Sequence, residues 1–564
     1  MVEKVKGSDK PWLKNYKLGP YPLKKTLEPY DKIPVYTFLD VSAEAYPNQV
    51  AIDYLGKKIR YSELREYVDR LANALAGLGV KKGDKVATIL PNCPQFIISD
   101  FAVSKTGAAL VPCSTLHRVH DLEYEIGESG AETVICSDEA LDMVHSIKDK
   151  TKLRNIIVTS PMDYSTEEPE VKEVTGAHQF KHLIANHEPN PPQVDIDPEE
   201  DLAYLIFTGG ATGVPKGVMI THYNKACTIR QMTWMLEPLW RGIKGKAAGE
   251  VVVPLFHTYG HTAVLCCIAL GLRIFLVSDP RDTDQAITIM KEHRPLVIFV
   301  VPTHLMRIAE KKVGRLPVLL MSAAAPLPEG IFDTIKREIQ MPVTEAYGLT
   351  ECGFSHANLT TFSKITGFAA KETLGIGLPV PDTDVQIVDM ETGEELGAGE
   401  SGEIIIRGPQ NMKGYWPTPG SGLDADGWLH TGDIGKMDEN GYFVLEDRIK
   451  DMANISGYKV YTTEVDEVLF KCPGVAMAAA VGIPDPERPG SERIKVFIKP
   501  KDEYKGKLTA DEIIAYCKEN LPAIAVPKSV EFKDDLPLTV TEKIFKRVLR
   551  EEEIKKMKEQ GLIE

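Results

Sequence analysis

The sequence predicts an α/β protein of more than one domain. Its 564 residues exceed one ordinary core, and the length suggests about three or four domain-sized units. Short apolar runs alternate with helical patterns through most of the chain, which is typical of parallel sheets covered on both faces. The pattern changes near residues 381 and 448. We therefore expect a large N-terminal body of two α/β subdomains plus a small β-rich subdomain, followed by a small α+β C-terminal domain.

The N-terminal body starts with a helix whose apolar residues recur at three- and four-residue spacing. Leu64, Val68, Leu71, Leu75 and Leu78 form one face of it. Buried strands are predicted at residues 85–90, 133–136, 156–159, 204–207, 251–253, 274–277, 297–301 and 318–321. Helices are predicted between them, for example at residues 263–270 and 328–338. Residues 161–200 are rich in Pro, Glu, Asp and Asn, which indicates a surface excursion.

The remainder of the chain divides into two smaller units. Short strands at residues 385–388, 403–407 and 442–445 indicate the β-rich subdomain. Helices at residues 464–470 and 511–520, with strands at 477–481 and 494–498, indicate the α+β domain. We place the boundary so that residues 1–447 form the N-terminal body and residues 448–564 the C-terminal domain.

The composition is that of a globular protein and argues against some partners. Lys+Arg number 66 against 81 Asp+Glu, and the net charge of −15 disfavours nucleic acid. The nine cysteines are scattered without a C-x-x-C pair, as expected for core residues in a reducing, cytoplasmic compartment. The first residues lack a signal-peptide pattern, and the apolar runs stop at about ten residues. Peripheral membrane contact stays open.

A glycine-rich segment, Thr208-Gly-Gly-Ala-Thr-Gly-Val-Pro-Lys-Gly217, follows the strand predicted at 204–207. Glycines, two threonines and a lysine after a strand bring backbone N–H groups and a cation onto a phosphate chain. The segment is not a Walker A loop, because Pro215 precedes Lys216 and no Ser or Thr follows the lysine. A plain glycine-rich turn is the alternative interpretation, and the ten-residue length with Pro-Lys-Gly at the end disfavours it.

This segment resembles the phosphate loop of the adenylate-forming superfamily, which comprises acyl-CoA synthetases, luciferases and the adenylation domains of peptide synthetases. The usual loop carries hydroxyl residues where this chain has Gly209 and Ala211. Further motifs of that superfamily follow in order: Pro254-Leu-Phe-His-Thr-Tyr-Gly260, Ser322-Ala-Ala-Ala-Pro326, Tyr347-Gly-Leu-Thr-Glu351, Thr431-Gly-Asp433, Asp447-Arg-Ile-Lys-Asp-Met452 and Pro537-Leu-Thr-Val-Thr-Glu-Lys-Ile544. The resemblance covers nearly the whole chain and is strongest to medium- and long-chain fatty-acyl-CoA ligases.

The resemblance implies a role for each motif. Lys543, His257 and Thr350 are the implied catalytic residues, and Glu351 is the implied Mg²⁺ ligand, a hard oxygen donor suited to that ion. Lys450 would be the hinge about which a mobile C-terminal domain rotates, and Ser456, Gly457 and Tyr458 would bind coenzyme A. The implied nucleotide-binding residues are Thr208, Gly209, Gly210, Thr212, Gly213, Lys216, Ala323, Ala324, Ala325, Pro326, Glu345, Ala346, Tyr347, Gly348, Thr350, Asp433 and Arg448.

The implied reaction has two steps and uses ATP, Mg²⁺ and coenzyme A. A carboxylate attacks the α-phosphorus of ATP to give acyl-AMP and pyrophosphate, and the coenzyme A thiol then displaces AMP. Lys543 would stabilise charge in the first step. This chain departs from the family at Glu542, where glycine is usual before the lysine, and at Asn454, where many relatives carry lysine.

The acid itself is less constrained. Pro11-Trp-Leu-Lys-Asn-Tyr16 resembles the N-terminal arm of medium- and long-chain ligases, and the apolar run at residues 261–270 suits methylene groups. We therefore expect a fatty acid and leave its length open. An aryl-acid ligase, a carrier-protein loader and a catalytically weakened paralogue are the alternatives. Homodimers are frequent among fatty-acid members, so a homodimer also stays open.

Overall fold

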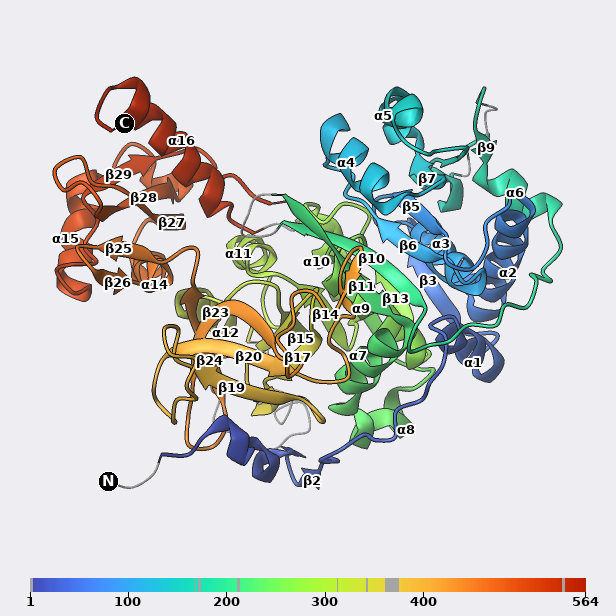
Figure 1. Cartoon of the computed structure of the whole chain (residues 1–564), viewed down its shortest axis with the longest axis horizontal. Helices are drawn as coiled ribbons and strands as arrows, with labels where there is room; N and C mark the ends of the chain where they lie inside the picture. Colours follow the sequence, from blue (N-terminus) through green and yellow to red (C-terminus); the bar gives the residue numbers. More distant parts are fainter. Residues whose placement is uncertain are drawn as a thin grey trace.

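The computed structural model describes residues 4–167, 169–170, 174–209, 214–311, 313–340, 343–360, 375–539 and 543–563. The predicted loop residues Gly210, Ala211, Thr212 and Gly213, and Glu542 beside the predicted catalytic lysine, lie outside these ranges. The expected fold class is confirmed, because two large α/β sheets, a four-stranded antiparallel sheet and a C-terminal α+β unit follow one another along the chain. Figure 1 shows the C-terminal unit next to the four-stranded sheet, at the opposite end from β5–β9.

The first large sheet is parallel in its centre and antiparallel at one edge. Strands β5, β7 and β8 were predicted from their apolar runs, because both of their faces are buried, whereas the equally buried β6 was not predicted. The antiparallel edge consists of β10, β11, β21 and β22. In order across the sheet the strands are β22 Thr418–Pro419, β21 Gly414–Tyr415, β11 Pro215–Thr221, β10 Leu202–Gly209, β6 Ala109–Pro112, β5 Lys85–Ile89, β7 Thr133–Ser137, β8 Asn155–Thr159 and β9 His178–Gln179.

The second large sheet has the same plan, with antiparallel strands at both edges. Its parallel centre runs β16, β15, β14, β12, β13 and β3, so the carboxyl ends of these strands share one edge. In order the strands are β18 Leu378–Pro379, β17 Gly353–Ala357, β16 Val343–Leu349, β15 Leu319–Ser322, β14 Val297–Val300, β12 Ala248–Val251, β13 Arg273–Leu276, β3 Val50–Tyr54 and β4 Lys57–Arg60.

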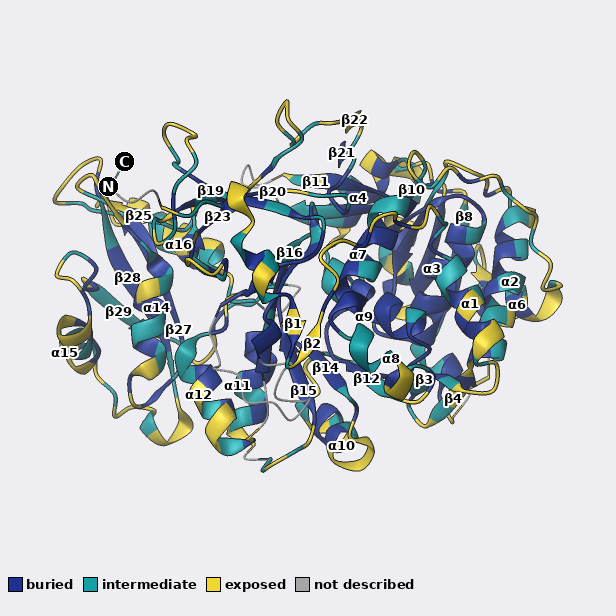
Figure 2. Cartoon of the chain, turned by 90° about the horizontal axis from the view of Figure 1, so that it is seen from below, coloured by how far each residue is buried: buried dark blue, intermediate teal, exposed yellow. Residues whose placement is uncertain are grey.

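Helices cover these sheets, and their buried faces follow the predicted periodicity. In α2, Leu64, Val68, Leu71 and Leu75 are all fully buried, whereas α3 is buried along nearly its whole length (Figure 2). The helices of the body are α1 Thr37–Ala45, α2 Tyr61–Gly77, α3 Pro94–Lys105, α4 Val119–Ser129, α5 Leu141–Ile147, α6 Phe180–Asn186, α7 His222–Trp234, α8 Trp240–Ile243, α9 Thr258–Ala269, α10 Thr283–His293, α11 Pro302–Glu310 and α12 Glu329–Glu338.

Residues 161–200 are not the plain surface excursion that their composition predicts. They contain α6, whose Phe180 is fully buried, and β9, which extends the first sheet. Polar residues between the buried positions conceal this short element from a reading of composition.

The four-stranded antiparallel sheet has the order β19-β20-β23-β24, and the N-terminal arm packs on it. Trp12 lies against Phe443 with ring centroids 6.0 Å apart, and Tyr16 lies 4.8 Å from Trp234 of α7. The arm contains the short strands β1 Lys17–Leu18 and β2 Tyr21–Pro22. The sheet consists of β19 Asp384–Val388, β20 Gly402–Arg407, β23 Leu429–Met437 and β24 Phe443–Arg448.

The C-terminal unit is a three-stranded sheet covered by helices, next to a small hairpin. Its elements are β25 Ala453–Ile455, β26 Tyr458–Val460, α14 Thr462–Lys471, β27 Val475–Pro484, β28 Glu492–Pro500, α15 Ala510–Asn520, β29 Ser529–Phe532 and α16 Lys546–Glu559. β24 ends at Arg448 and β25 begins at Ala453. The division of the chain after residue 447 stays a prediction.

None of the helices in the described part of the chain is long and apolar enough to span a membrane.

Glu250 on β12 is an unpaired carboxyl in the core. It is fully buried, neither carboxylate oxygen has a hydrogen-bond partner among the described residues, and burial raises its pKa well above the ordinary value. The native state therefore retains a proton that the unfolded chain releases, so this group's contribution to stability is lost as pH rises above the ordinary carboxyl range. A buried polar group without a partner costs about 1–3 kcal/mol.

We expect Glu250→Met to raise the apparent melting temperature by roughly 2–4 °C at pH 8, and by less at pH 5. Differential scanning fluorimetry at both pH values measures this, with the exposed Glu310→Met as the matched control. A gain of the same size at both pH values would show that the carboxyl is not the source.

Candidate active site

The predicted phosphate loop closes a β-hairpin between β10 and β11. Thr208 pairs with Lys216, and Gly209 pairs with Pro215, at the end of the two strands. The strand after the loop was not predicted from the sequence, because its glycine and proline are unusual in strands. Lys216 is exposed, and its Nζ lies 4.9 Å from the centre of the Tyr415 ring. The hairpin therefore places the Lys216 cation beside Thr208 at the end of the two strands.

Tyr415 connects this hairpin to the predicted metal ligand. Its hydroxyl donates to Glu351 Oε1 over 3.0 Å, while its ring lies under Lys216. Glu351 and the buried Thr350 occupy the turn between β16 and β17. Tyr415 was not predicted as a site residue, because it lies outside the recognised motifs. The structure thus brings the predicted phosphate and metal residues together through a residue that was not predicted.

Gly348 permits this turn to form. A Cβ atom there would lie 1.9 Å from the carbonyl oxygen of Gly353 on the paired strand, so no larger residue fits. The motif that carries Tyr347, Thr350 and Glu351 is therefore a tight hairpin.

Asp433 is the centre of a buried polar group near β16. Its Oδ2 accepts from the Tyr347 hydroxyl over 2.8 Å, and its Oδ1 accepts from Arg448 Nε over 2.7 Å. The carboxylate is only 4% exposed, and Arg448 faces it across the β23–β24 pair. The carboxylate of Asp433 is the main cause that raises the pKa of Arg448. These three predicted residues therefore form one charged network.

The loop after β15 contains the predicted residues Ala323–Pro326 in a strained conformation, with Ala324 at φ 73°. Glu345 holds this loop from the neighbouring strand. Its two oxygens accept from the backbone N–H groups of Leu327 at 3.0 Å and Gly375 at 2.8 Å. Burial is the main cause that raises the pKa of Glu345. The carboxylate is therefore engaged by the protein, and Glu345 shapes the loop beside Ala346.

His257, near the middle of the chain, and Lys543, near its C-terminus, approach each other in the fold. His257 is the N-cap of α9, and its Nδ1 accepts from the Tyr259 N–H over 3.3 Å. Burial, then the nearby Lys543, lower the pKa of His257 to about 3, so the imidazole is neutral. Burial, then Arg448, lower the pKa of Lys543 to about 8, against the opposing attraction of Asp433. Lys543 therefore lies within electrostatic range of both His257 and the Asp433 network.

Two hydrogen bonds join Lys543 to Thr539. The Thr539 N–H donates to the Lys543 carbonyl over 2.7 Å, and the Lys543 N–H donates to Thr539 Oγ1 over 3.1 Å. The α16 helix begins three residues later, and Lys546 pairs with Asp466 of α14 at 2.6 Å.

The C-terminal unit also contacts the body through α14 and α12. Glu467 of α14 accepts from the Glu329 N–H, the first residue of α12, over 3.0 Å, and Lys471 forms an ion pair with Glu329. Asp447 at the end of β24 accepts from the Thr463 hydroxyl over 3.0 Å. We call Glu329, Glu467 and Lys471 the α12–α14 contact. These bonds hold the unit in the orientation that brings Lys543 to His257.

The predicted coenzyme A residues lie apart from this centre. Ser456 and Gly457, with φ values of 52° and 88°, form the two-residue turn between β25 and β26, and Tyr458 is 68% exposed. Among the described residues, no hydrogen bond joins this turn to Asp433 or His257. Lys450 lies in the segment between β24 and β25.

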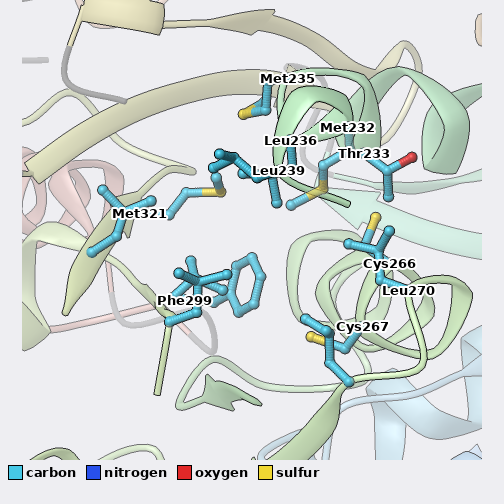
Figure 3. Close-up of a pocket in the computed structure, with 14 residues that line it drawn as sticks. Met232, Thr233, Met235, Leu236, Leu239, Cys266, Cys267, Leu270, Phe299 and Met321 are labelled. Carbon is cyan, nitrogen blue, oxygen red and sulfur yellow. The ribbon is translucent and has the colours of Figure 1, made fainter. Parts of the chain in front are cut away.

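An apolar cavity lies at the far end of α9 from His257 (Figure 3). Side chains of α7 and α9 and of strands β14 and β15 surround it, and three methionines, Met232, Met235 and Met321, contribute to its wall. Its volume is about 30 Å³, close to the space of one water in the liquid. Methionine side chains adapt readily, so this wall can move aside for a longer apolar ligand. The residues that line the cavity are Met232, Thr233, Met235, Leu236, Leu239, Cys266, Cys267, Leu270, Leu272, Leu296, Val297, Phe299, Leu319 and Met321.

Comparisons with known proteins agree with this geometry. The AMP-binding enzyme family matches residues 39–416, and the AMP-binding enzyme C-terminal domain matches residues 464–543. The long-chain-fatty-acid–CoA ligase of Bacillus subtilis is 34% identical over 97% of this chain and 98% of its own. The feruloyl-CoA synthase of an Amycolatopsis species is 31% identical over 90% of this chain and 96% of its own.

Among solved structures, ATP-bound MatB from Rhodopseudomonas palustris superposes with a TM-score of 0.81 at 26% identity, covering 93% of this chain and 99% of its own. The expected membership in the adenylate-forming superfamily is thereby confirmed. The chain belongs to the AMP-binding enzyme family and is an AMP-forming acid–CoA ligase.

Proposed function

We propose that this ligase activates a long-chain fatty acid. The acid's carboxylate attacks the α-phosphorus of ATP and releases pyrophosphate, and the coenzyme A thiol then displaces AMP from the acyl-AMP to give acyl-CoA. The apolar cavity beyond His257 carries the proposal, because methylene groups gain about 0.8 kcal/mol each when they leave water. The similarity to long-chain-fatty-acid–CoA ligases over nearly the full chain supports the same substrate class.

In this proposal the described residues divide the work of the first step. The β10–β11 hairpin and Lys216 take the triphosphate, and Asp433 with Arg448 takes the ribose in place of their present bonds. Tyr347 stacks on adenine beside the strained Ala323–Pro326 loop. Neutral His257 lies next to the carboxylate without adding a charge, and Lys543 faces the oxygens that become negative as the α-phosphorus is attacked.

Glu351 is suited to hold Mg²⁺ there. Its carboxylate oxygens are hard donors, and only Tyr415 among the described side chains bonds one of them. Mg²⁺ needs few protein ligands, since phosphate oxygens and waters complete its shell. When bound, the ion neutralises triphosphate charge. Tyr415 keeps the carboxylate oriented toward the hairpin.

We expect Tyr415→Phe to raise the Mg²⁺ concentration for half-maximal activity by roughly threefold to tenfold, because one hydrogen bond to a charged group is lost. Titrating Mg²⁺ at saturating ATP and acid measures this, and Tyr124→Phe, whose hydroxyl bonds the Pro215 carbonyl instead, is the matched control. An unchanged Mg²⁺ requirement would separate Tyr415 from the metal site.

A coenzyme A-consumption screen tests the function itself. Fatty acids of graded length and aryl acids are compared, alongside carboxylate-dependent ATP–pyrophosphate exchange. We expect the highest kcat/KM with long fatty acids. A preference for aryl acids would favour a role like that of the Amycolatopsis relative. Exchange without coenzyme A consumption would indicate a carrier-protein loader, and no exchange with any acid would indicate a weakened paralogue.

The proposal also covers the cellular location and the assembly of the enzyme. The scattered, buried cysteines support a reducing, cytoplasmic location. A homodimer is proposed from the resemblance, and peripheral contact with a membrane stays open from the sequence; sedimentation and vesicle co-pelleting test the two.

A further inference from the structure

A buried lysine faces α9, the helix that has His257 at its start and the apolar cavity at its far end. Lys225 lies on α7 and is only 2% exposed. It precedes Met232 by seven residues, which is two helical turns, so both residues lie on the same face of α7. Met232, Met235 and Leu236 line the cavity from this face. Lys225 therefore continues the wall of the cavity toward the start of α7.

Positions along the facing helix, α9, show where Lys225 lies between His257 and the cavity. His257 caps α9, Thr262 follows five residues later, and Cys266 reaches the cavity wall nine residues after the cap. Lys225 Nζ donates to Thr262 Oγ1 over 2.7 Å. The rise along a helix puts Thr262 roughly 7 Å from the cap, between His257 and the cavity. The positive charge of Lys225 also lowers the pKa of His257, after burial and Lys543.

The Lys225 ammonium has more N–H donors than its described neighbours offer acceptors. Of the described residues, only Thr262 accepts a hydrogen bond from it, and no carboxylate lies within ion-pair distance. The nearest carboxylate, Asp100, instead bonds His261 Nε2 at 2.7 Å. The remaining neighbours are the Tyr204 ring, centred 5.5 Å away, and the thiol of Cys266. An ammonium carries three N–H donors, so two of them have no hydrogen-bond acceptor in the part of the chain that the structure describes.

An acid with its carboxylate beside His257 and its methyl end in the cavity would pass this ammonium, because Thr262 lies between the two along α9. A plain hydrocarbon chain would cover the two donors and leave them without a partner, which is costly in a buried site. An oxygen atom on the chain would accept from them, and hydrogen bonds to charged groups are the stronger kind.

We propose that Lys225, oriented by Thr262, is a specificity-determining residue that binds an oxygen atom on the acyl chain, nearer its carboxyl end than its methyl end. The preferred substrates are then fatty acids that carry a hydroxyl or oxo group at that position. This inference rests on the proposed function and narrows its substrate class. The competing interpretation is that Lys225 only offsets the charge of Asp100 in the core.

Acids of one chain length test the proposal. The plain acid is compared with hydroxy acids whose hydroxyl moves from the β carbon to the ω carbon, and kcat/KM is measured by coenzyme A consumption. We expect the native enzyme to prefer one of the hydroxy acids by about tenfold to a hundredfold, with the optimum nearer the carboxyl end. Lys225→Met should reduce that preference to less than about threefold and retain activity on the plain acid.

Two further variants serve as an independent check and as a control. Thr262→Val keeps the charge and removes its anchor, so it should lower the preference several-fold if Lys225→Met fails to fold. The exposed Lys246→Met is the matched control and should keep the native preference. A native enzyme without a preference, or a Lys225→Met enzyme that loses activity on all the acids in equal proportion, overturns the inference. If no fatty acid is consumed at all, the proposed function fails instead.

Discussion

Replacing Lys543 by alanine is expected to abolish adenylation and to spare thioester formation from supplied acyl-AMP. Lys543 is the cation that the C-terminal unit brings within range of His257 and Asp433. Removing one preorganised donor to a developing oxyanion typically costs about 10²–10³ in rate, and here a full charge is lost. In the second step the thiol attacks the carbonyl carbon and not the α-phosphorus, so the lysine has no equivalent task.

ATP–pyrophosphate exchange measures the first half-reaction, and thioester formation from synthetic acyl-AMP measures the second. Lys555→Ala, an exposed lysine of α16, is the matched control. Equal loss of both half-reactions would refute this division of labour.

The same lysine predicts a pH dependence. Its pKa of about 8 means that the charged form dominates below pH 8 and disappears above it. We therefore expect kcat/KM for ATP, which reports the free enzyme, to fall as pH rises through about 8. If kcat/KM for ATP in the exchange reaction stayed constant up to about pH 9.5, well above the pKa of Lys543, this prediction would be contradicted.

Replacing Asp433 by asparagine is expected to lower kcat/KM for ATP by about 10² or more. Both oxygens of this buried carboxylate are in use, by Tyr347 and Arg448, and both would be offered to the ribose. Asparagine presents an NH₂ group to one of these partners and leaves the Arg448 guanidinium without its counter-charge. Hydrogen bonds to charged groups contribute about 1.5–3 kcal/mol each, so the loss of two corresponds to a factor of about 10² to 10⁴.

Unlike the change at Lys543, this one should weaken both half-reactions, because AMP is held throughout. The assay is initial rate against ATP concentration and, separately, against acyl-AMP concentration. Asp426→Asn, in an exposed turn, is the control. A loss confined to one half-reaction would contradict a shared ribose contact.

Much of this architecture could be predicted from local pattern. Strands buried on both faces, such as β7, and helices with one apolar face, such as α2, have patterns that burial alone dictates. The motifs that carry Asp433, Tyr347 and Lys543 were recognised because their order along the chain is distinctive. Their roles remain proposals, while the structure places all three in one network or next to it.

The features that escaped prediction depend on contacts between distant segments. Tyr415 is positioned by the pairing of β21 with β11, about two hundred residues earlier, which no local pattern reports. Lys225 looks like a solvated helix residue in the sequence, and only the packing of α7 on α9 buries it. Glu250 is hidden in the same way, because a single carboxyl in an apolar strand looks like an exposed position.

The α12–α14 contact links the orientation of the C-terminal unit to the protonation of Glu467. Burial, more than any other cause, raises the pKa of Glu467 to about 7 from an ordinary 4.5, although the Glu329 N–H and Lys471 oppose the shift, while Asp466 and Glu329 add to it. If the unit rotates as the resemblance implies, Glu467 meets water and its pKa returns toward the ordinary value. In that case the orientation with Lys543 beside His257 binds a proton that the rotated one releases. We therefore propose that the advantage of this orientation is full below about pH 4.5 and declines as pH rises through 7, so that alkalinity eases the passage from adenylation to thioester formation.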